Sequence, residues 1–178
     1  MISLDNIEKL KKEFSDWYAK NAQLELRVKA LDERYDPVDN ILAFLLVVQL
    51  IEFELMQLMY VIRYALVFEG LIHRNKDRQK LPRWYSENST FGGQLKIDFQ
   101  EYKKIKTYKF MNKIDDLIYN KDTGICKLRN EYIHRLYFMF LSSKDVGNLA
   151  KSRMQDCYMA LNLIRRTGEN LMKLTKDI

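Results

Sequence analysis

The sequence predicts an all-α protein in which about five long helices form an antiparallel bundle. Glycine and proline are scarce, at 6 and 2 residues, so the chain lacks the turn residues that a β-sandwich or barrel needs. Hydrophobic residues make up 47% and charged residues 30%, which excludes disorder and collagen as the main state. The 178 residues form one helical domain, with a long N-terminal helix in residues 1–35 and a bundle in residues 36–178.

The first expected helix runs from about Leu4 to Arg34 and carries an apolar heptad stripe. Asn21 is the one polar member of this stripe. It either fixes the register of a helix pair, as a buried asparagine does in a coiled coil, or lies at a groove edge in contact with water. The stripe consists of Ile7, Leu10, Phe14, Trp17, Asn21, Leu24, Val28 and Leu31.

The second expected helix begins after Asp36, a natural N-cap, with Pro37 in its first turn. It runs to about Glu69, and Gly70 follows as the residue that ends it. From residue 41 to residue 59 nearly every face of this helix is apolar. The pattern predicts that it is the central helix of the bundle.

The same helix contains the longest apolar run, Ile41–Val48, which is shorter than a membrane span and is followed by Glu52 and Glu54. No secretory signal is evident at the N-terminus, so we expect a cytoplasmic protein without a membrane partner. Two residues turn a helix by about 200°, which places Glu52 and Glu54 on different faces. We therefore expect exposed edges or partners for cations such as Arg63, and not a paired-carboxylate site.

The rest of the chain divides into helices separated by polar turns. Residues 71–90 are the longest irregular stretch, and Ser89 or Thr90 is the expected cap of the next helix. Asn120–Gly124 forms a turn, and Ser142–Asp145 breaks the chain again. The expected helices are about Phe91 to Lys106, Tyr108 to Asn120, Ile125 to Leu141, and Asp145 to Lys176.

Positive charge is concentrated in the middle of the chain. Residues 72–113 carry 11 Lys/Arg against 4 Asp/Glu, whereas the whole chain has a net charge of +6. Arg74, Lys76 and Arg78 lie in this segment, close to aromatic residues such as Trp84. Such a segment can bind a phosphate backbone and stack bases, and the alternative is a solvated loop and helix face.

Metal and nucleotide-cofactor sites lack the necessary residues. The only cysteines are Cys126 and Cys157, and the only histidines are His73 and His134, so neither a disulfide framework nor a four-ligand zinc site is expected. The phosphate-loop, dinucleotide and metalloprotease motifs are absent from the sequence. We expect no cofactor and no metal.

One short segment combines residue types that are suited to catalysis. Residues 128–134 read Leu-Arg-Asn-Glu-Tyr-Ile-His. Arg129, Asn130 and His134 resemble the R-x(4–6)-H signature of HEPN domains, in which a polar residue follows the arginine. Residues 90–95, Thr-Phe-Gly-Gly-Gln-Leu, resemble a helix start found in several of these proteins. The resemblance covers about residues 36 to 175 and leaves the N-terminal helix as an addition.

This resemblance implies a HEPN-like bundle and a metal-independent endoribonuclease. Such proteins act as homodimers with the motif at the interface, and many are toxins or phage-defence effectors. It implies that Arg129, Asn130 and His134 are catalytic. Some relatives are instead non-catalytic modules that bind nucleotides or RNA, or partners of a minimal nucleotidyltransferase that acts as antitoxin.

The residue chemistry fits RNA cleavage. An imidazole can take the proton of the 2′-hydroxyl or protonate the leaving oxygen, and a guanidinium can hold the phosphate. Five residues advance a helix by about 500°, so Arg129 and His134 point about 140° apart, whereas Asn130 and His134 share a face. Two chains that cross at a two-fold axis can combine them. Tyr132 and Arg135 complete the predicted RNA-binding set, although Tyr132 also belongs to the core stripe of its helix.

Two simpler readings compete with catalysis. His134 can be a hydrogen-bonded core histidine, with Arg129 paired to Asp122 or Glu131. The whole chain can also be a structural helical dimer, held by the heptad stripe of the first helix.

Overall fold

The computed structural model describes residues 4–34, 36–68, 93–105, 109–141 and 143–174, and these residues form six helices and no strand. The prediction of an all-α protein is therefore confirmed. The described helices are α1 (Leu4–Asp32), α2 (Pro37–Phe68), α5 (Gln94–Ile105), α6 (Lys109–Tyr119), α7 (Ile125–Leu141) and α8 (Ser143–Leu174).

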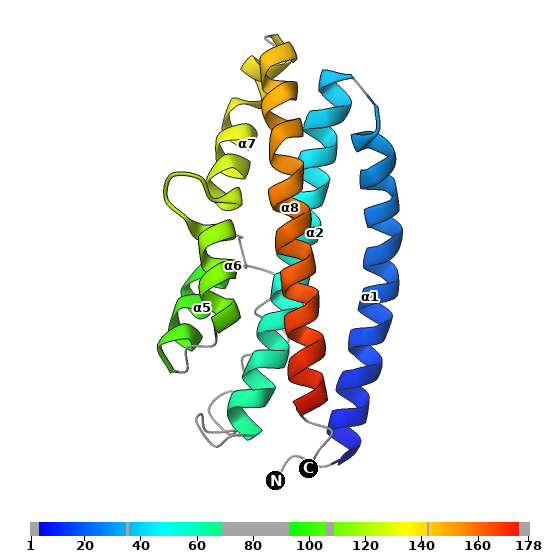
Figure 1. Cartoon of the computed structure of the whole chain (residues 1–178), viewed down its shortest axis with the longest axis vertical. Helices are drawn as coiled ribbons and strands as arrows, with labels where there is room; N and C mark the ends of the chain where they lie inside the picture. The colour runs from blue at the N-terminus through cyan, green and yellow to red at the C-terminus, as the bar shows by residue number, and fades with distance from the viewer. Residues whose placement is uncertain (1–3, 35, 69–92, 106–108, 142, 175–178) are drawn as a thin grey trace.

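The helices do not simply alternate in direction. In Figure 1, α1 runs upward and α2 runs back down beside it, α5 lies antiparallel to α6, and α6 and α7 return the chain to the top. The last helix, α8, then runs down beside α2 and in the same direction. The most extensive helix contact is this pairing of α2 with α8. The structure therefore does not confirm the predicted antiparallel bundle, because its most extensive helix pair is parallel.

Local side-chain signals explain two of the helix ends. The Asp36 Oδ1 atom accepts hydrogen bonds from the backbone N–H groups of Val38, at 2.8 Å, and Asp39, at 3.1 Å. This bonding confirms Asp36 as the N-cap of α2. The side chain of Asn120 makes the same kind of turn before α7, since its Oδ1 accepts the N–H groups of Asp122 and Thr123.

Other helix starts differ from the expectation. The last helix begins at Ser143 instead of about Asp145, so Asp145 lies within its first turn. A carboxylate there is stabilised by the helix dipole, which explains why residues 143–145 of the polar run are helical. Helix α5 begins at Gln94, and its first turn is closed by a bond from Ile97 N–H to the Gly93 carbonyl. The expected caps Ser89 and Thr90, and Gly70, lie outside the described residues.

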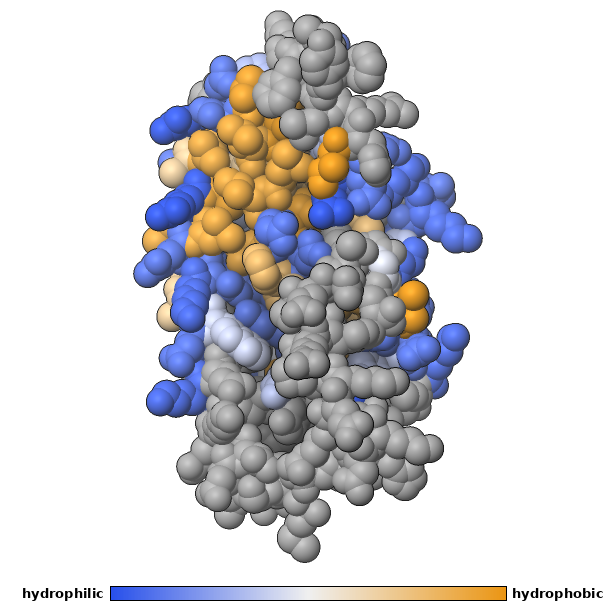
Figure 2. All heavy atoms as spheres, turned by 180° about the vertical axis from the view of Figure 1, so that it is seen from behind, coloured by the Kyte–Doolittle hydropathy of each residue, from blue (hydrophilic) through white to orange (hydrophobic). Residues whose placement is uncertain are grey.

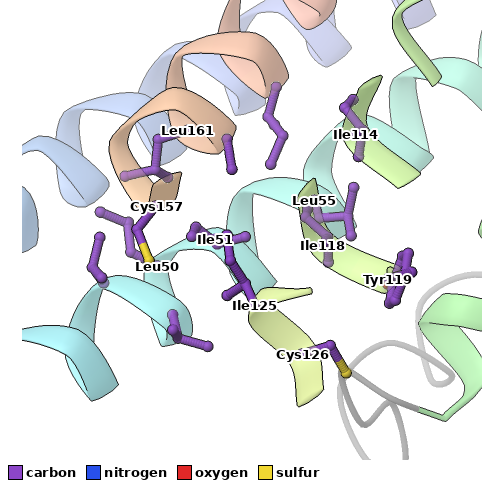
Figure 3. Packing of buried hydrophobic residues seen from close by; sticks show 14 of the residues in the cluster. Leu50, Ile51, Leu55, Ile114, Ile118, Tyr119, Ile125, Cys126, Cys157 and Leu161 are labelled. Atoms are coloured by element: carbon purple, nitrogen blue, oxygen red, sulfur yellow. The ribbon is translucent and has the colours of Figure 1, made fainter. Parts of the chain in front are cut away.

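Helix α2 is the centre of the core, as predicted. Figure 3 shows Leu50, Ile51 and Leu55 of α2 packed among residues of α6, α7 and α8. Both cysteines are buried as free thiols, and burial raises the pKa of each. The largest fully buried side chains are Phe44, Phe99, Ile41, Leu50, Ile51, Leu55, Leu58, Met59, Ile62 and Leu95.

One helix among the described residues is long and apolar enough to cross a membrane by length and composition. This is α2 over Pro37–Arg63, and 61% of its most apolar window is buried inside the bundle.

The parallel pairing of α2 and α8 begins with a close backbone approach. A Cβ atom added to Gly147 of α8 would lie 2.5 Å from the Cα atom of Pro37, at the start of α2. No other residue type leaves room for that contact. Gly147 therefore allows the beginnings of the two helices to meet.

Polar contacts also join α1 to α2 and α8. The guanidinium of Arg165 on α8 bonds Glu54 on α2 and, at 2.6 Å, Glu25 on α1. Asn21 donates a hydrogen bond to Gln57 at 3.3 Å, so it faces α2 in a partly buried position. Of its two predicted roles, the helix-pairing one agrees with this contact.

The two carboxylates of α2 correct the expectation of exposed edges. Glu52 and Glu54 are both buried, and each has a cation nearby, Arg129 for Glu52 and Arg165 for Glu54. The prediction that they serve as partners for cations is confirmed. Burial raises the pKa of Glu54 even though hydrogen bonds from Arg165 act against it.

Candidate active site

The candidate site lies on the second turn of α7, which is fixed against α2 by its inward face. The Tyr132 ring packs edge-on against Phe44, with ring centroids 4.9 Å apart and planes at 78°. Leu128, one turn earlier, is also buried. These two contacts set the rotation of α7, so Arg129 and Asn130 lie between the buried and the exposed sides of the helix.

Arg129 and Asn130 contact each other directly. The Arg129 Nη1 atom donates a hydrogen bond of 3.1 Å to Asn130 Oδ1. The Arg129 Nη2 atom lies 4.0 Å from Glu52 Oε2, which joins α7 to α2. The Glu52 side chain is 7% exposed and that of Arg129 is 25% exposed, so a largely buried carboxylate holds a guanidinium that solvent can reach. The structure thus brings together two of the three predicted catalytic residues.

Glu52 belongs to this site, although its place in the sequence does not predict a contact with Arg129. It also accepts a hydrogen bond of 3.4 Å from Gln49, one turn earlier on α2. The two partners considered for Arg129 from the sequence, Asp122 and Glu131, do not pair with it among the described residues. Glu131 instead lies 3.9 Å from Lys127. A contact between helices far apart in sequence replaces the local pairs that the sequence suggested.

The pKa of the Cys126 thiol depends on burial and on the charged groups near this site. Burial raises the pKa of the Cys126 thiol, Lys96 and Arg129 lower it, and Glu52 raises it further. The thiol is therefore protonated at neutral pH and is not an activated nucleophile. Lys96, on α5, also lies over the ring of Tyr119 at 5.6 Å.

The remaining predicted residues are placed only in part. His134 and Arg135 belong to α7, whose helix continues through both, but their side chains lie outside the described residues. In a continuous helix Asn130 and His134 are one turn apart on one face. Arg74, Lys76 and Arg78 lie outside the described residues altogether.

Tyr132 is a core residue in the single chain, as its stripe position predicted. It is buried, and its hydroxyl has no hydrogen-bond partner within the part of the chain that the structure describes. Burial raises the pKa of Tyr132 to about 12. The ring leaves no exposed face on which a base could stack, so its predicted RNA contact finds no support in this placement.

An uncharged apolar surface lies beside Arg129. We call it the outer face of α2, and it consists of Leu42, Leu45, Leu46, Gln49 and Phe53. Leu42 is 42% exposed and Phe53 is 45% exposed. Ile133, one turn after Arg129 on α7, is 44% exposed. Figure 2 shows apolar side chains gathered on the upper back of the molecule, at the level of the N-terminal half of α2.

The sequence carried a signal for this face. Helix α2 is apolar on more sides than one bundle can cover, and positions 42, 45, 49 and 53 are spaced three, four and four residues apart, which puts them on one helical face. This excess predicts a central helix that the rest of the bundle surrounds. The structure shows instead that one side is left uncovered in the single chain.

The described residues contain no group of three or more His, Cys, Asp or Glu side chains that could hold a metal ion. Comparison of the chain with family models, curated proteins and solved structures gives no match. The function therefore has to be argued from the residues themselves.

Proposed function

We propose that this chain is a metal-independent endoribonuclease of the HEPN type, a cytoplasmic toxin or phage-defence effector that acts as a homodimer. The observation that carries the proposal is the bonded pair of Arg129 and Asn130, held by buried Glu52 at a solvent-accessible position one helical turn before His134. The net charge of +6 suits a polyanionic substrate.

Each residue has a distinct role in this proposal. The Arg129 guanidinium binds the scissile phosphate and stabilises the charge that develops on it. The His134 imidazole takes the proton of the attacking 2′-hydroxyl or gives one to the leaving 5′ oxygen. Asn130 orients Arg129 through its Oδ1 atom and shares the helix face of His134. The products are a 2′,3′-cyclic phosphate and a 5′-hydroxyl, and DNA is not cut because it lacks the attacking group.

The homodimer rests on the outer face of α2. This face and Ile133 are apolar, uncharged and adjacent to Arg129, which is joined to α2 through Glu52. A second copy related by a two-fold axis offers the same surface, so the face would be self-complementary. That arrangement would place two copies of Arg129 and Asn130 at the edges of one interface.

The first test is cleavage of labelled RNA and matched DNA in the presence of EDTA. We expect wild-type protein to cut RNA alone and His134→Ala to be inactive. Arg129→Lys keeps the charge but loses the planar fork, so cleavage should fall by about a hundredfold or more. Lys127→Arg, at an exposed position of the same helix, is the matched control and should cut normally.

Two results would contradict the proposal. Equal cleavage by wild type and His134→Ala would place the activity elsewhere. RNA binding without cleavage by either protein would favour the non-catalytic reading, in which the chain is a nucleotide- or RNA-binding module or the partner of a nucleotidyltransferase-type antitoxin.

A further inference from the structure

A groove between α6 and α8 lies apart from the candidate active site, which is built from α2 and α7. Its volume is about 500 Å³, within the range of small-molecule sites. The groove has an apolar floor and a polar rim. Its lining residues are Lys113, Asp116, Leu117, Met159, Asn162, Leu163 and Arg166.

The lining residues form two facing stripes. On α6 they are spaced i, i+3 and i+4 from Lys113, and on α8 they are spaced i, i+3, i+4 and i+7 from Met159. These spacings put each set on one face of its helix. The groove is therefore a regular feature of the α6–α8 packing.

The cations of the groove have no ion-pair partner among the described residues. Lys113 and Arg166 are exposed, and neither forms an ion pair with any other described residue. The one carboxylate of the lining, Asp116, accepts a hydrogen bond of 3.1 Å from the Asn120 side chain through its Oδ1 atom. The neighbouring Asp115 pairs with Lys103 at 2.7 Å. Within the described part of the chain, two cations without an ion pair thus lie beside a carboxylate that retains an acceptor oxygen.

The apolar floor suits a flat ring. Met159 is 44% exposed, and Leu117 and Leu163 lie partly buried beside it. A methionine sulfur makes favourable contacts with aromatic rings. Asn162, exposed on the same helix face, carries both a donor and an acceptor that can bond the edge of such a ring.

We infer that this groove binds a ribonucleotide, with the phosphate between Lys113 and Arg166, the base on Met159 and Leu163, and a ribose hydroxyl donating to Asp116. A simple anion leaves Asp116 and the apolar floor unexplained, and an apolar ligand leaves the two cations unexplained. A nucleotide offers all three chemistries in one molecule. The ribonucleotide can be a free mononucleotide or one unit of an RNA strand.

The experiment measures binding of AMP, dAMP, inorganic phosphate and a short single-stranded oligoadenylate by calorimetry. The His134→Ala protein is used throughout, so that no strand is cut and the result does not depend on the proposed activity. The double variant Lys113→Gln/Arg166→Gln should weaken AMP binding by about tenfold or more. Its matched control is Lys20→Gln/Arg27→Gln, which also removes one exposed lysine and one exposed arginine, but on α1.

Asp116→Asn tests the ribose contact. We expect wild type to prefer AMP over dAMP and the variant to lose that preference. Oligoadenylate that binds much more tightly than AMP identifies a strand as the source, and equal or weaker binding identifies the free nucleotide. The inference is overturned if neither AMP nor oligoadenylate binds saturably, if phosphate binds as well as AMP, or if the double variant and its control behave alike.

Discussion

The Arg165 Nε atom on α8 donates to both carboxylate oxygens of Glu54 on α2, at 2.7 and 3.0 Å, and the same guanidinium bonds Glu25 on α1. One partly buried side chain therefore ties three helices together. Removing one partner of a buried pair leaves the other charge uncompensated, which costs more than the pair itself contributes.

This relationship predicts the effect of Arg165→Met. The variant leaves the buried carboxylate of Glu54 without its cation and leaves Glu25 with Lys29 alone, so the free energy of unfolding should fall by about 3–5 kcal/mol. Urea denaturation measures this change. Arg166→Met, at the exposed neighbouring position, should change it by less than about 0.5 kcal/mol. Similar values for the two variants would contradict a role for the buried cluster.

Glu25 makes the stability of the protein depend on pH in the acid range. Burial raises the pKa of Glu25, but hydrogen bonds from Lys29 and Arg165 outweigh it and hold this pKa below the ordinary value of 4.5. A carboxyl with a lowered pKa in the folded state contributes stability above its unfolded pKa and loses it as the pH falls through the folded pKa. The stability difference between wild type and Glu25→Gln should therefore be present at pH 7 and shrink below pH 4.5.

The measurement is urea denaturation of both proteins at a series of pH values. Lys20→Gln, on the exposed side of α1, serves as the control for general charge effects. A difference that stays constant into the acid range would show that Glu25 does not titrate in this way.

Gly147→Ala tests the contact between the beginnings of α2 and α8. The added Cβ would lie 2.5 Å from Pro37 Cα and 2.8 Å from the Pro37 carbonyl oxygen, so the helices must separate. We expect a loss of about 1–3 kcal/mol, although alanine is the better helix former. Asn148→Ala, at the next and exposed position, should be neutral or slightly stabilising. Thermal and urea unfolding of the two variants measure the change in stability. A Gly147→Ala protein that is as stable as wild type would contradict the close approach.

The outer face of α2 predicts which substitutions separate the proposed dimer. Leu42→Glu/Phe53→Glu places two charges on this face and should weaken self-association by about a hundredfold or more. Light scattering after gel filtration measures the mass directly. Leu26→Glu is the control, because Leu26 is 67% exposed on α1 and lies outside this face. Dissociation by Leu26→Glu alone would instead favour a dimer built on the first helix.

Local signals in the sequence were sufficient for several helix ends. The side chains of Asp36 and Asn120 bond backbone groups two and three residues away, so their turns could be read directly. The helix that bears the candidate site has the predicted bounds, Ile125–Leu141.

Long-range relationships could not be read in this way. Arg165 and Glu54 are separated by 111 positions, and no local pattern indicates that they meet in the interior. The same holds for Glu52, whose contact with Arg129 depends on how α7 packs against α2. The direction of α8 relative to α2 depends on how the chain is connected between them, and periodicity says nothing about it.

The parallel pairing of the second and last helices also determines when the protein can finish folding during synthesis. The main core contact joins segments more than a hundred residues apart, as the separation of 111 between Glu54 and Arg165 shows. Until α8 leaves the ribosome, the apolar surface of α2 lacks its largest partner. A nascent chain without α8 exposes the apolar surface of α2, so we expect C-terminal truncations to aggregate or to require a chaperone.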